Sequence, residues 1–387
     1  ITLTVEAQNM ALLNISSSGN VTDDDVITPE SLQITRLVVQ RILSPLIVIC
    51  GVIGNLFNII VLCHRKMRNS TNVYLMYLAI CDTLYLIFMF VLSFVDCNKE
   101  NMSFDAFHYI PYGRMASDLF GNSAVWLTVV FTLERFFGVC YPMKGKTLCT
   151  VKKARVVSLL VFVLCLCNTI PNLFEIEVKE YEFNNTEGYI LRCEASELSK
   201  RKSYSIGFYW WYVTFFSVLP FTFLFIFNSM LIKSVWDANK RRQLLANSRV
   251  IGENPRQTME QQRVTIMLIT VVVIFLVCQL PWTVLLLFRV ANDIAKPSIT
   301  IRILGNICNL LVQINASVNF LLYSYFSSKF RRTFKGLFCA WRRPKTSYSK
   351  CRNGSDMLRK STSSKENTTV TDVSTYRSNK RTDLYRH

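Results

Sequence analysis

Two adjacent ionisable residues, Glu134 and Arg135, stand at the end of a stretch, Leu119–Leu133, that carries no charge. A carboxylate beside a guanidinium can form an ion pair. At the edge of an apolar segment such groups are costly, so they indicate a functional role. Phe136 follows directly and completes a triplet of two charged residues and one aromatic residue. The triplet predicts a functional ion pair, and a static salt bridge without a further role is the alternative.

The elements that must position this triplet are long uncharged stretches, which recur along a chain of 387 residues that is 51% hydrophobic. Each is about as long as the roughly 17–25 residues of a membrane-spanning helix. Five of them are free of charge: Ile42–Cys63, Val156–Phe174, Ser203–Ile232, Val264–Phe288 and Ile303–Ser328. Two further stretches of similar length carry few charges: Asn72–Val95 and Met115–Leu133. Backbone groups in lipid must be satisfied within a helix. The sequence therefore predicts an all-α membrane protein, a bundle of seven transmembrane helices.

The formal net charge of +18 could suggest binding to nucleic acid, but its distribution argues against that. Basic residues gather in alternate short connections: Arg65, Lys66, Arg68, Lys144, Lys146, Lys152, Lys153, Arg155, Lys240, Arg241, Arg242, Arg249 and Arg256. The connection between spans four and five is acidic instead, with Glu175, Glu177, Glu180, Glu182, Glu187, Glu194 and Glu197. An excess of Lys and Arg marks cytoplasmic loops. We therefore expect a multi-pass plasma-membrane protein with its amino terminus outside and its carboxyl tail inside.

The chain divides into four predicted regions. Residues 1–40 form a polar extracellular tail, residues 41–328 the seven-helix domain, residues 329–340 an amphipathic helix on the membrane surface, and residues 341–387 a disordered cytoplasmic tail. Glycosylation acceptors fall on the predicted outer side at Asn14, Asn20, Asn101 and Asn184. Such three-residue motifs also occur by chance.

The predicted eighth helix follows from a stretch, Ser328–Phe338, in which aromatic and basic residues alternate at helical spacing. This composition suits a helix lying on an anionic inner leaflet, so membrane lipids are an expected partner. Cys339 follows and is a palmitoylation candidate, with an unmodified thiol as the alternative. The Ser/Thr-rich, basic residues from Lys345 onward are suited to phosphorylation.

Six motifs lie in a fixed order across residues 51–330. The chain carries Gly51, Gly54 and Asn55 in span one, and Leu78, Ala79 and Asp82 in span two. Glu134, Arg135 and Phe136 end span three, Pro220 lies in span five, Pro281 in span six, and Asn319, Tyr323 and Phe330 close the series. In this order and spacing the chain resembles the rhodopsin-like G-protein-coupled receptors. The segments Cys140–Arg155 and Ile314–Tyr323 are most similar to the FMRFamide-type neuropeptide receptors of invertebrates.

The resemblance implies a conformational switch. In the resting state Arg135 stays near Glu134, and an agonist outside favours an outward swing of helix six that frees Arg135 for a heterotrimeric G protein. Asn228 and Tyr323 are the expected stabilisers of that open state. Arrestin and receptor kinases are the expected partners of the tail. A second implied site is a mid-membrane polar set of Asn55, Asp82, Asn315 and Asn319, either an allosteric Na⁺ pocket or a hydrogen-bonded network without an ion; no other metal or cofactor is expected.

For the ligand, the resemblance favours an extracellular amidated neuropeptide of the RF-amide type. We expect Ser117 and Asp118 at the opening of the pocket, where Asp118 could pair with an arginine of the peptide. Alternatively, Asp118 pairs with Arg114 or faces solvent. The expected floor of the pocket comprises Asn122, Trp211, Gln279 and Trp282.

Several positions depart from the family pattern. Gln279 stands where the family usually has tryptophan, Phe320 where it has proline, and Ile110 where it has a cysteine at the outer end of span three. Cys97 and Cys193 are the cysteines on the predicted outer side, and two thiols in an oxidising compartment favour a bridge between them. The alternatives are two unpaired thiols or another partner near Cys50.

Other classes of function fit less well. No enzyme is expected, because the three histidines are not spaced as metal ligands and no GxSxG motif lies within a span. A transporter or channel should show inverted repeats or broken helix pairs, which are not evident. A receptor of the same fold for a biogenic amine or a lipid is the main alternative. An amine receptor is expected to carry aspartate at the position of Ser117.

Overall fold

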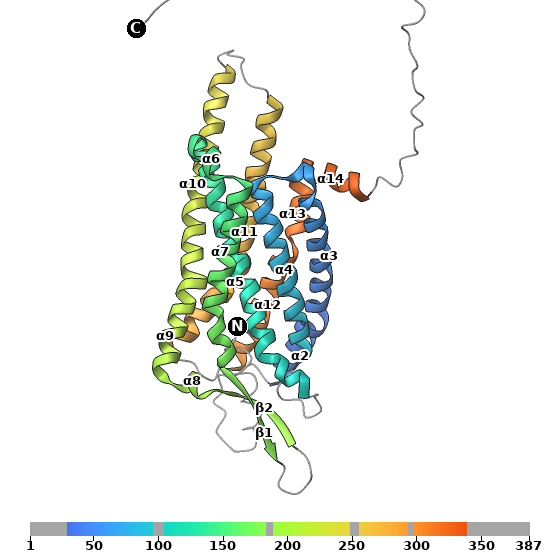
Figure 1. Ribbon diagram of the computed structural model, residues 1–387, viewed down its shortest axis with the longest axis vertical. Helices are drawn as coiled ribbons and strands as arrows, with labels where there is room; N and C mark the ends of the chain where they lie inside the picture. Colours follow the sequence, from blue (N-terminus) through green and yellow to red (C-terminus); the bar gives the residue numbers. More distant parts are fainter. Residues whose placement is uncertain (1–28, 96–103, 183–188, 248–254, 293–297, 339–387) are drawn as a thin grey trace, which may run out of the picture. The chain divides into compact units, whose positions relative to one another are not determined.

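The computed structural model describes residues 29–95, 104–182, 189–247, 255–292 and 298–338, all within the first of two units, Ile1–Ala340. Its helices include seven that are long and apolar enough to cross a membrane. They are Glu30–Cys63, Ser70–Phe94, Phe107–Cys140, Val151–Phe174, Lys202–Ser234, Ile269–Ala291 and Ile299–Phe326. The predicted seven-helix bundle is confirmed (Figure 1).

The first span begins before the boundary predicted at residue 41. It comprises α2 (Pro29–Arg36), the π-helix η2 (Leu37–Leu43) and α3 (Ser44–Cys63). Proline is well suited to the first turn of a helix because its missing N–H has no partner there in any case. Leu32 is already buried, so the packed part of this span includes residues that composition alone had assigned to a polar tail.

The third span, α5 (Phe104–Cys140), is the central element of the bundle, in contact with α4 (Ser70–Phe94), α7 (Val151–Thr169) and α10 (Leu219–Asn247). Side-chain caps start several neighbouring helices. Asn69 accepts a hydrogen bond from the N–H of Asn72 at the start of α4, and Thr150 does the same for Lys153 at the start of α7. Each cap satisfies a backbone donor that the first helical turn leaves free.

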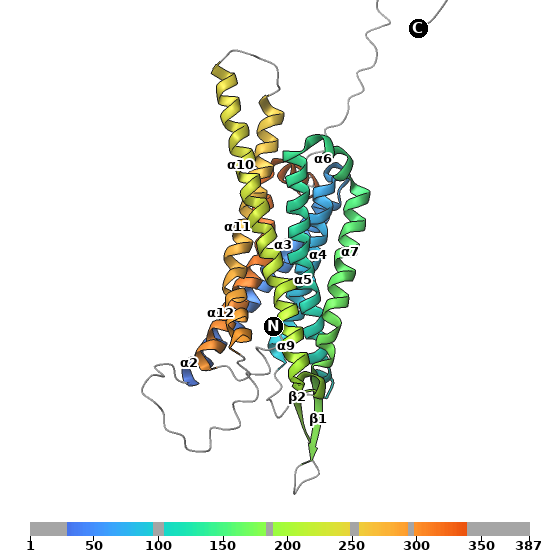
Figure 2. The ribbon, with the colours of Figure 1, turned by 90° about the vertical axis from the view of Figure 1, so that its left-hand side faces the viewer.

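A β-hairpin follows the fourth span. After the short helix η4 (Ile170–Phe174), strands β1 (Ile176–Glu182) and β2 (Tyr189–Ala195) pair antiparallel, with Ile176 opposite Ala195. The one-turn helix α8 (Glu197–Lys200) leads to the next span. Figures 1 and 2 show the hairpin at one end of the bundle and the helix α6 (Pro142–Leu148), which follows the Glu134 triplet, at the opposite end.

The fifth span contains a π-helical turn. α9 (Lys202–Val213) continues through η5 (Thr214–Val218) into α10, and the N–H of Leu219 bonds to the carbonyl of Thr214, five residues earlier. Pro220 follows immediately, and a proline cannot donate the backbone hydrogen bond that an α-helix needs at this point. The widened turn is a physical consequence of that missing donor.

The last elements are α11 (Pro255–Ala291), which continues through Pro281, then α12 (Ile299–Ser317), α13 (Asn319–Phe326) and α14 (Ser328–Phe338). α14 contacts α13, α3 and η3 (Arg65–Met67), and Phe330 is its buried anchor. Large apolar side chains such as Phe225 and Val277 are exposed on the outside of the spans, as expected where the solvent is lipid.

Candidate functional site

The Glu134 triplet lies near the end of α5. Nη2 of Arg135 is 3.3 Å from Oε1 of Glu134, whose side chain is only 7% exposed. Phe136 is buried, and its ring contacts those of Tyr141 and Phe227. The side chains of Glu134 and Arg135 are therefore paired in a largely dry environment, the arrangement that the sequence predicted for the closed form of a switch.

Cys149 is a neighbour of the triplet that the sequence did not predict. Its thiol donates a hydrogen bond to the backbone carbonyl of Glu134, with 3.6 Å between sulfur and oxygen. Burial, together with the nearby Glu134 carboxylate, raises the pKa of the Cys149 thiol above its ordinary value. No local motif distinguishes Cys149 in the sequence, because the contact depends on the fold of the connection between α5 and α7.

Asn228 and Tyr323 are buried but do not bond to Arg135. Asn228 donates to the carbonyl of Leu224 in its own helix across 2.7 Å. The Tyr323 hydroxyl has no hydrogen-bond partner in the described part of the chain, and its ring lies 6.2 Å from that of Phe330. Neither side chain therefore supports the Glu134–Arg135 ion pair in this conformation, as expected if both act in a different state.

The mid-membrane polar set is largely assembled. Asn319 donates to Oδ2 of Asp82 across 2.6 Å, and both side chains are buried. Asn55 instead donates to the carbonyl of Ala316 across 2.8 Å. Asp82, Asn315 and Asn319 line a common inner cavity, with about 410 Å³ of space including the part open to solvent. Asn55 does not line this cavity, but its bond to Ala316 connects α3 to α12 beside it.

The inner cavity offers one carboxylate together with neutral oxygens from Tyr85, Thr128, Gln279, Asn315 and Asn319. One negative charge with several neutral oxygen donors fits a monovalent cation, and these are the residues that would hold it. Ser123 is fully buried, does not line this cavity, and its hydroxyl has no hydrogen-bond partner in the described part of the chain.

A second, outer cavity is lined by residues of the second, third, fifth, sixth and seventh spans, with about 580 Å³ of space including its open part. Its polar lining is neutral: the carboxamides of Asn122, Gln279 and Asn309, and hydroxyls such as those of Ser217 and Thr283. Aromatic and aliphatic side chains complete it, namely Tyr85, Val125, Tyr212, Phe216, Phe221, Trp282, Leu286 and Val312. Among the residues that line this cavity, none carries a charge.

Three of the six predicted ligand contacts, Asn122, Gln279 and Trp282, therefore share one cavity. Asn122 donates to the hydroxyl of Tyr212 across 2.8 Å, which fixes the direction of its amide. Sequence reasoning missed Asn309 and Tyr212. Asn309 lies in α12 between two other amide residues, Asn306 and Gln313. Helical spacing alone did not indicate which of the three amides faces the cavity.

The other three predicted contacts lie elsewhere. Ser117 and Asp118 are fully buried; Ser117 donates to the carbonyl of Arg114, and Asp118 accepts from Asn172. Trp211 is 53% exposed on the outside of the bundle, where its indole donates to Asn168 across 2.9 Å. The structure thus does not bring these side chains to the cavity that contains Asn122.

The two cavities share part of their lining, namely Tyr85, Gly121, Val125, Gln279 and Val312. Gln279 takes the position where the sequence pattern led us to expect tryptophan. An amide at the boundary allows hydrogen bonds on both sides of it, since a carboxamide is both donor and acceptor.

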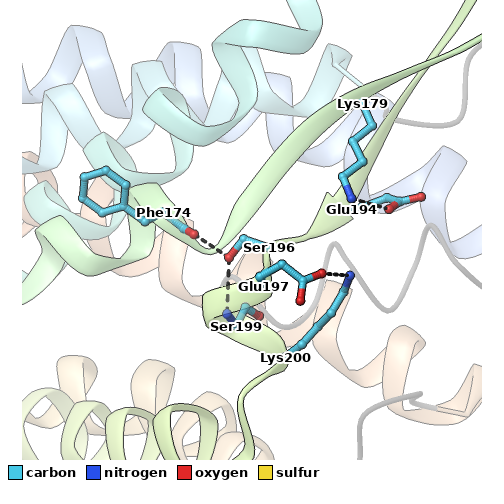
Figure 3. A network of polar contacts seen from close by, with 7 residues as sticks. All are labelled: Phe174, Lys179, Glu194, Ser196, Glu197, Ser199 and Lys200. Atoms are coloured by element: carbon cyan, nitrogen blue, oxygen red, sulfur yellow. Dashed lines mark hydrogen bonds and ion pairs between the residues drawn. The ribbon is translucent and has the colours of Figure 1, made fainter.

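The hairpin and α8 carry a network of charges near the outer cavity's end of the bundle (Figure 3). Lys179 lies 3.5 Å from Glu194 across the two strands, and Lys200 lies 2.9 Å from Glu197. The Ser196 hydroxyl donates to the carbonyl of Phe174 and accepts from the N–H of Ser199. Hydrogen bonding between Glu197 and Lys200 lowers the pKa of the carboxyl and raises the pKa of the amine.

Ile110 occupies the position where a cysteine was expected. It is buried beside Phe107, and Val178 and Cys193 of the hairpin pack against this pair. Cys193 is disulfide-bonded, whereas nine other described cysteines are free thiols. Cys97, the predicted partner, lies outside the described residues, as do the glycosylation candidates Asn14, Asn20, Asn101 and Asn184 and the palmitoylation candidate Cys339.

Comparison with known proteins agrees with this geometry. Residues 54–323 match the model of the 7 transmembrane receptor (rhodopsin family). The FMRFamide receptor of Drosophila melanogaster is 30% identical over 314 residues, which cover 77% of this chain and 53% of that receptor. The matched region therefore spans about half of the fly receptor.

Two further relatives are more distant. The sex peptide receptor-related protein 2 of Caenorhabditis elegans is 25% identical over 343 residues, covering 79% of this chain and 72% of that protein. The growth hormone secretagogue receptor type 1 of Sus scrofa is 27% identical over 297 residues, covering 73% of this chain and 76% of that protein.

Proposed function

Because this chain belongs to the rhodopsin family of seven-transmembrane receptors, and is therefore a receptor rather than an enzyme, we propose that it recognises an extracellular amidated neuropeptide and activates a heterotrimeric G protein. The amino terminus and the hairpin face outward, and the Glu134 triplet faces the cytoplasm. The excess of Lys and Arg near η3 and α6 supports this orientation.

The observation that carries the ligand proposal is the neutral lining of the outer cavity. Asn122, Gln279 and Asn309 offer carboxamide donors and acceptors, and Phe216 and Trp282 offer aromatic surface. A C-terminal phenylalanine amide presents the matching groups: one ring and one uncharged carboxamide. A free C-terminal carboxylate would enter the same cavity without a cation to compensate its charge, and burying an unpaired charge is costly.

An amine ligand fits the cavity less well. A protonated amine needs a carboxylate within reach, and Asp118 is fully buried with Asn172 as its partner. The named relatives are an FMRFamide receptor of the fly, a sex peptide receptor-related protein of the worm and a growth hormone secretagogue receptor of the pig. A lipid tail would offer no hydrogen-bonding group to the carboxamides that line the cavity.

Basic residues of the peptide are expected to remain near the hairpin. Glu177, Glu180 and Glu197 are exposed there, and clustered acidic residues raise the local concentration of a cationic ligand. The proposed Cys97–Cys193 bridge attaches the hairpin to the segment that follows span two.

Signal transfer follows from the two ends of α5. A peptide that binds more tightly to one of two bundle conformations shifts their equilibrium by that difference in affinity. We place the cytoplasmic change at Arg135, which leaves Glu134 and engages the G protein, with Asn228 and Tyr323 as its new neighbours. α14 lies on the inner leaflet, and the tail is the substrate of receptor kinases and the binding site for arrestin.

The test uses matched peptides. Cells that express the full chain are exposed to Phe-Met-Arg-Phe-amide and to the same peptide with a free carboxylate, and calcium and cyclic nucleotide are recorded. The amide is expected to activate at concentrations at least about tenfold lower, since leaving buried polar groups unpaired costs about 1–3 kcal/mol. The matched control Arg135→Ala should bind the labelled amide at the cell surface without signalling. Equal potency of the acid and the amide would contradict the ligand proposal.

A further inference from the structure

A continuous series of aromatic side chains connects the outer cavity with the Glu134 triplet. We name it the aromatic ladder, and it consists of Phe216, Phe215, Trp126, Phe223, Phe227 and Phe136. Phe216 lines the outer cavity, and Phe136 directly follows Arg135 in the chain. The ladder therefore begins at the site of the ligand and ends at the switch.

Each step of the ladder is a ring contact. The centroid of Phe215 lies 5.0 Å from that of Phe216 and 5.0 Å from that of Trp126. Trp126 is followed by Phe223 at 6.4 Å, and Phe223 by Phe227 at 6.2 Å. Phe227 lies 5.4 Å from Phe136. All of these separations fall within the range of about 4.5–7 Å in which aromatic pairs attract.

The ladder crosses between two helices. Trp126 and Phe136 belong to α5, whereas the other four rings belong to η5 and α10. The two α5 rings are separated by about 15 Å along the helix axis, given a rise of about 1.5 Å per residue. Their rigid spacing along α5 means that a shift of α10 against α5 must change the ring contacts at both ends.

The top of the ladder is directly linked to the cavity. The Phe216 ring lies 4.8 Å from that of Tyr212, and the hydroxyl of Tyr212 accepts a hydrogen bond from Asn122. Tyr212 and Asn122 both line the outer cavity. A ligand that engages the Asn122 amide therefore competes for the group that orients Tyr212, and through it the Phe216 ring.

Trp126 has a feature that simple packing does not require. Its indole N–H is shielded from solvent and has no hydrogen-bond partner in the described part of the chain. An unsatisfied donor is a cost to this conformation, and a conformation in which the indole finds an acceptor would recover it. A change in the position of the Trp126 ring that brings its N–H to an acceptor would therefore be favourable.

We propose that the aromatic ladder is the coupling element of this receptor, and that Trp126 and Phe227 are positioning residues that set Phe136, and with it Arg135, according to the occupant of the outer cavity. The proposal rests on the proposed function for the identity of the two ends.

The first experiment needs no ligand. The full chain in lipid nanodiscs is compared with Trp126→Leu by hydrogen–deuterium exchange of the segment around Phe136. Trp126→Leu should accelerate exchange there, about 15 Å from the substitution. The conservative Trp126→Phe, which keeps a ring, should restore slow exchange. Phe225→Leu is the matched control, because Phe225 lies in α10 but is 69% exposed on the outside of the bundle. Unchanged exchange in Trp126→Leu would overturn the ladder.

The second experiment uses Phe-Met-Arg-Phe-amide as the probe and GTPγS binding to the G protein as the readout. Trp126→Leu and Phe227→Leu should each raise the half-maximal peptide concentration by about tenfold, while peptide affinity without G protein stays within about twofold. The double variant should lose no more than either single variant, because a series broken once is not broken further. Additive losses, or losses equal to that of Phe225→Leu, would reject the ladder.

The two failures are distinguishable. If the unmodified chain responds to the peptide and the variants respond equally well, the ladder is wrong and the proposed function stands. If the unmodified chain does not respond, the ligand proposal fails for this peptide, and the exchange measurement still decides whether Trp126 controls the segment around Phe136.

Discussion

Asn172 donates a hydrogen bond to Asp118 across 3.1 Å, and both side chains are almost completely buried. The bond joins η4, which leads into the hairpin, to the half of α5 that lies nearer the hairpin. The other carboxylate oxygen of Asp118 has no hydrogen-bond partner in the described part of the chain. The Asp118 carboxylate therefore attaches the base of the hairpin to the bundle.

Asn172→Ala should lower the stability of the receptor because it leaves the Asp118 carboxylate without this donor. Loss of one partner of a buried polar pair costs about 1–3 kcal/mol. Thermal unfolding in detergent, followed with a thiol-reactive dye, measures the loss.

The potencies of Phe-Met-Arg-Phe-amide and of an analogue with citrulline in place of arginine should shift equally in Asp118→Asn. A selective loss for the arginine peptide would make Asp118 a ligand contact instead.

Sodium should weaken agonist binding through Asp82. The inner cavity pairs this carboxylate with neutral oxygens, and Asn319 bonds to it across 2.6 Å. Replacing choline chloride by sodium chloride at constant ionic strength should reduce agonist affinity by about fivefold, the lower end of typical allosteric coupling. Asp82→Asn should abolish this dependence. The same sodium response in Asp82→Asn would show that the cavity holds a hydrogen-bonded network without an ion.

Gly51→Ala should destabilise the contact between the first and seventh spans. A Cβ at Gly51 would lie 2.7 Å from Cδ1 of Leu86 and 2.8 Å from Cβ of Ser317, closer than packed atoms approach. Overpacking of this kind costs about 1–3 kcal/mol. Gly207→Ala is the control, because a Cβ there meets nothing within 4 Å and alanine favours a helix. Equal thermal stability of the two variants would contradict this packing.

Alkylation of Cys149 should require a higher pH than that of an ordinary thiol. Burial first, and the Glu134 carboxylate second, disfavour the thiolate, so the pKa of Cys149 is raised and the reactive form appears later as pH increases. Glu134→Gln removes the negative charge and should move the pH dependence of maleimide labelling to lower pH. Mass spectrometry of the labelled peptide measures it. An unchanged dependence would indicate that burial alone controls this thiol.

The spans and the Glu134–Arg135 ion pair were predictable because they depend on local composition and on motifs in fixed order. Seven apolar helices and the Asn319–Asp82 pair were expected from the sequence and are present. The start of the first span was not, since Pro29–Gln40 mixes apolar and polar residues and its helicity depends on packing, as the burial of Leu32 shows.

The lining of the outer cavity was only half predictable for a geometric reason. Adjacent residues of a helix point about 100° apart, so a small error in helical phase moves a side chain from the cavity to a neighbouring helix. Asp118 found a partner in Asn172, and Trp211 found one in Asn168. Both partners lie in distant segments that local sequence cannot bring together.

Gln279 has a consequence for chemists as well as for the receptor. One carboxamide is part of the partition between an outer chamber and an inner one that contains Asp82. A slender molecule that displaces the Gln279 side chain could extend through both cavities. One end would contact the neutral amides of the outer cavity, and a basic group at the other end would pair with the Asp82 carboxylate. Such a compound would occupy both cavities at once: the inner one, proposed for a sodium ion, and the outer one, proposed for the peptide.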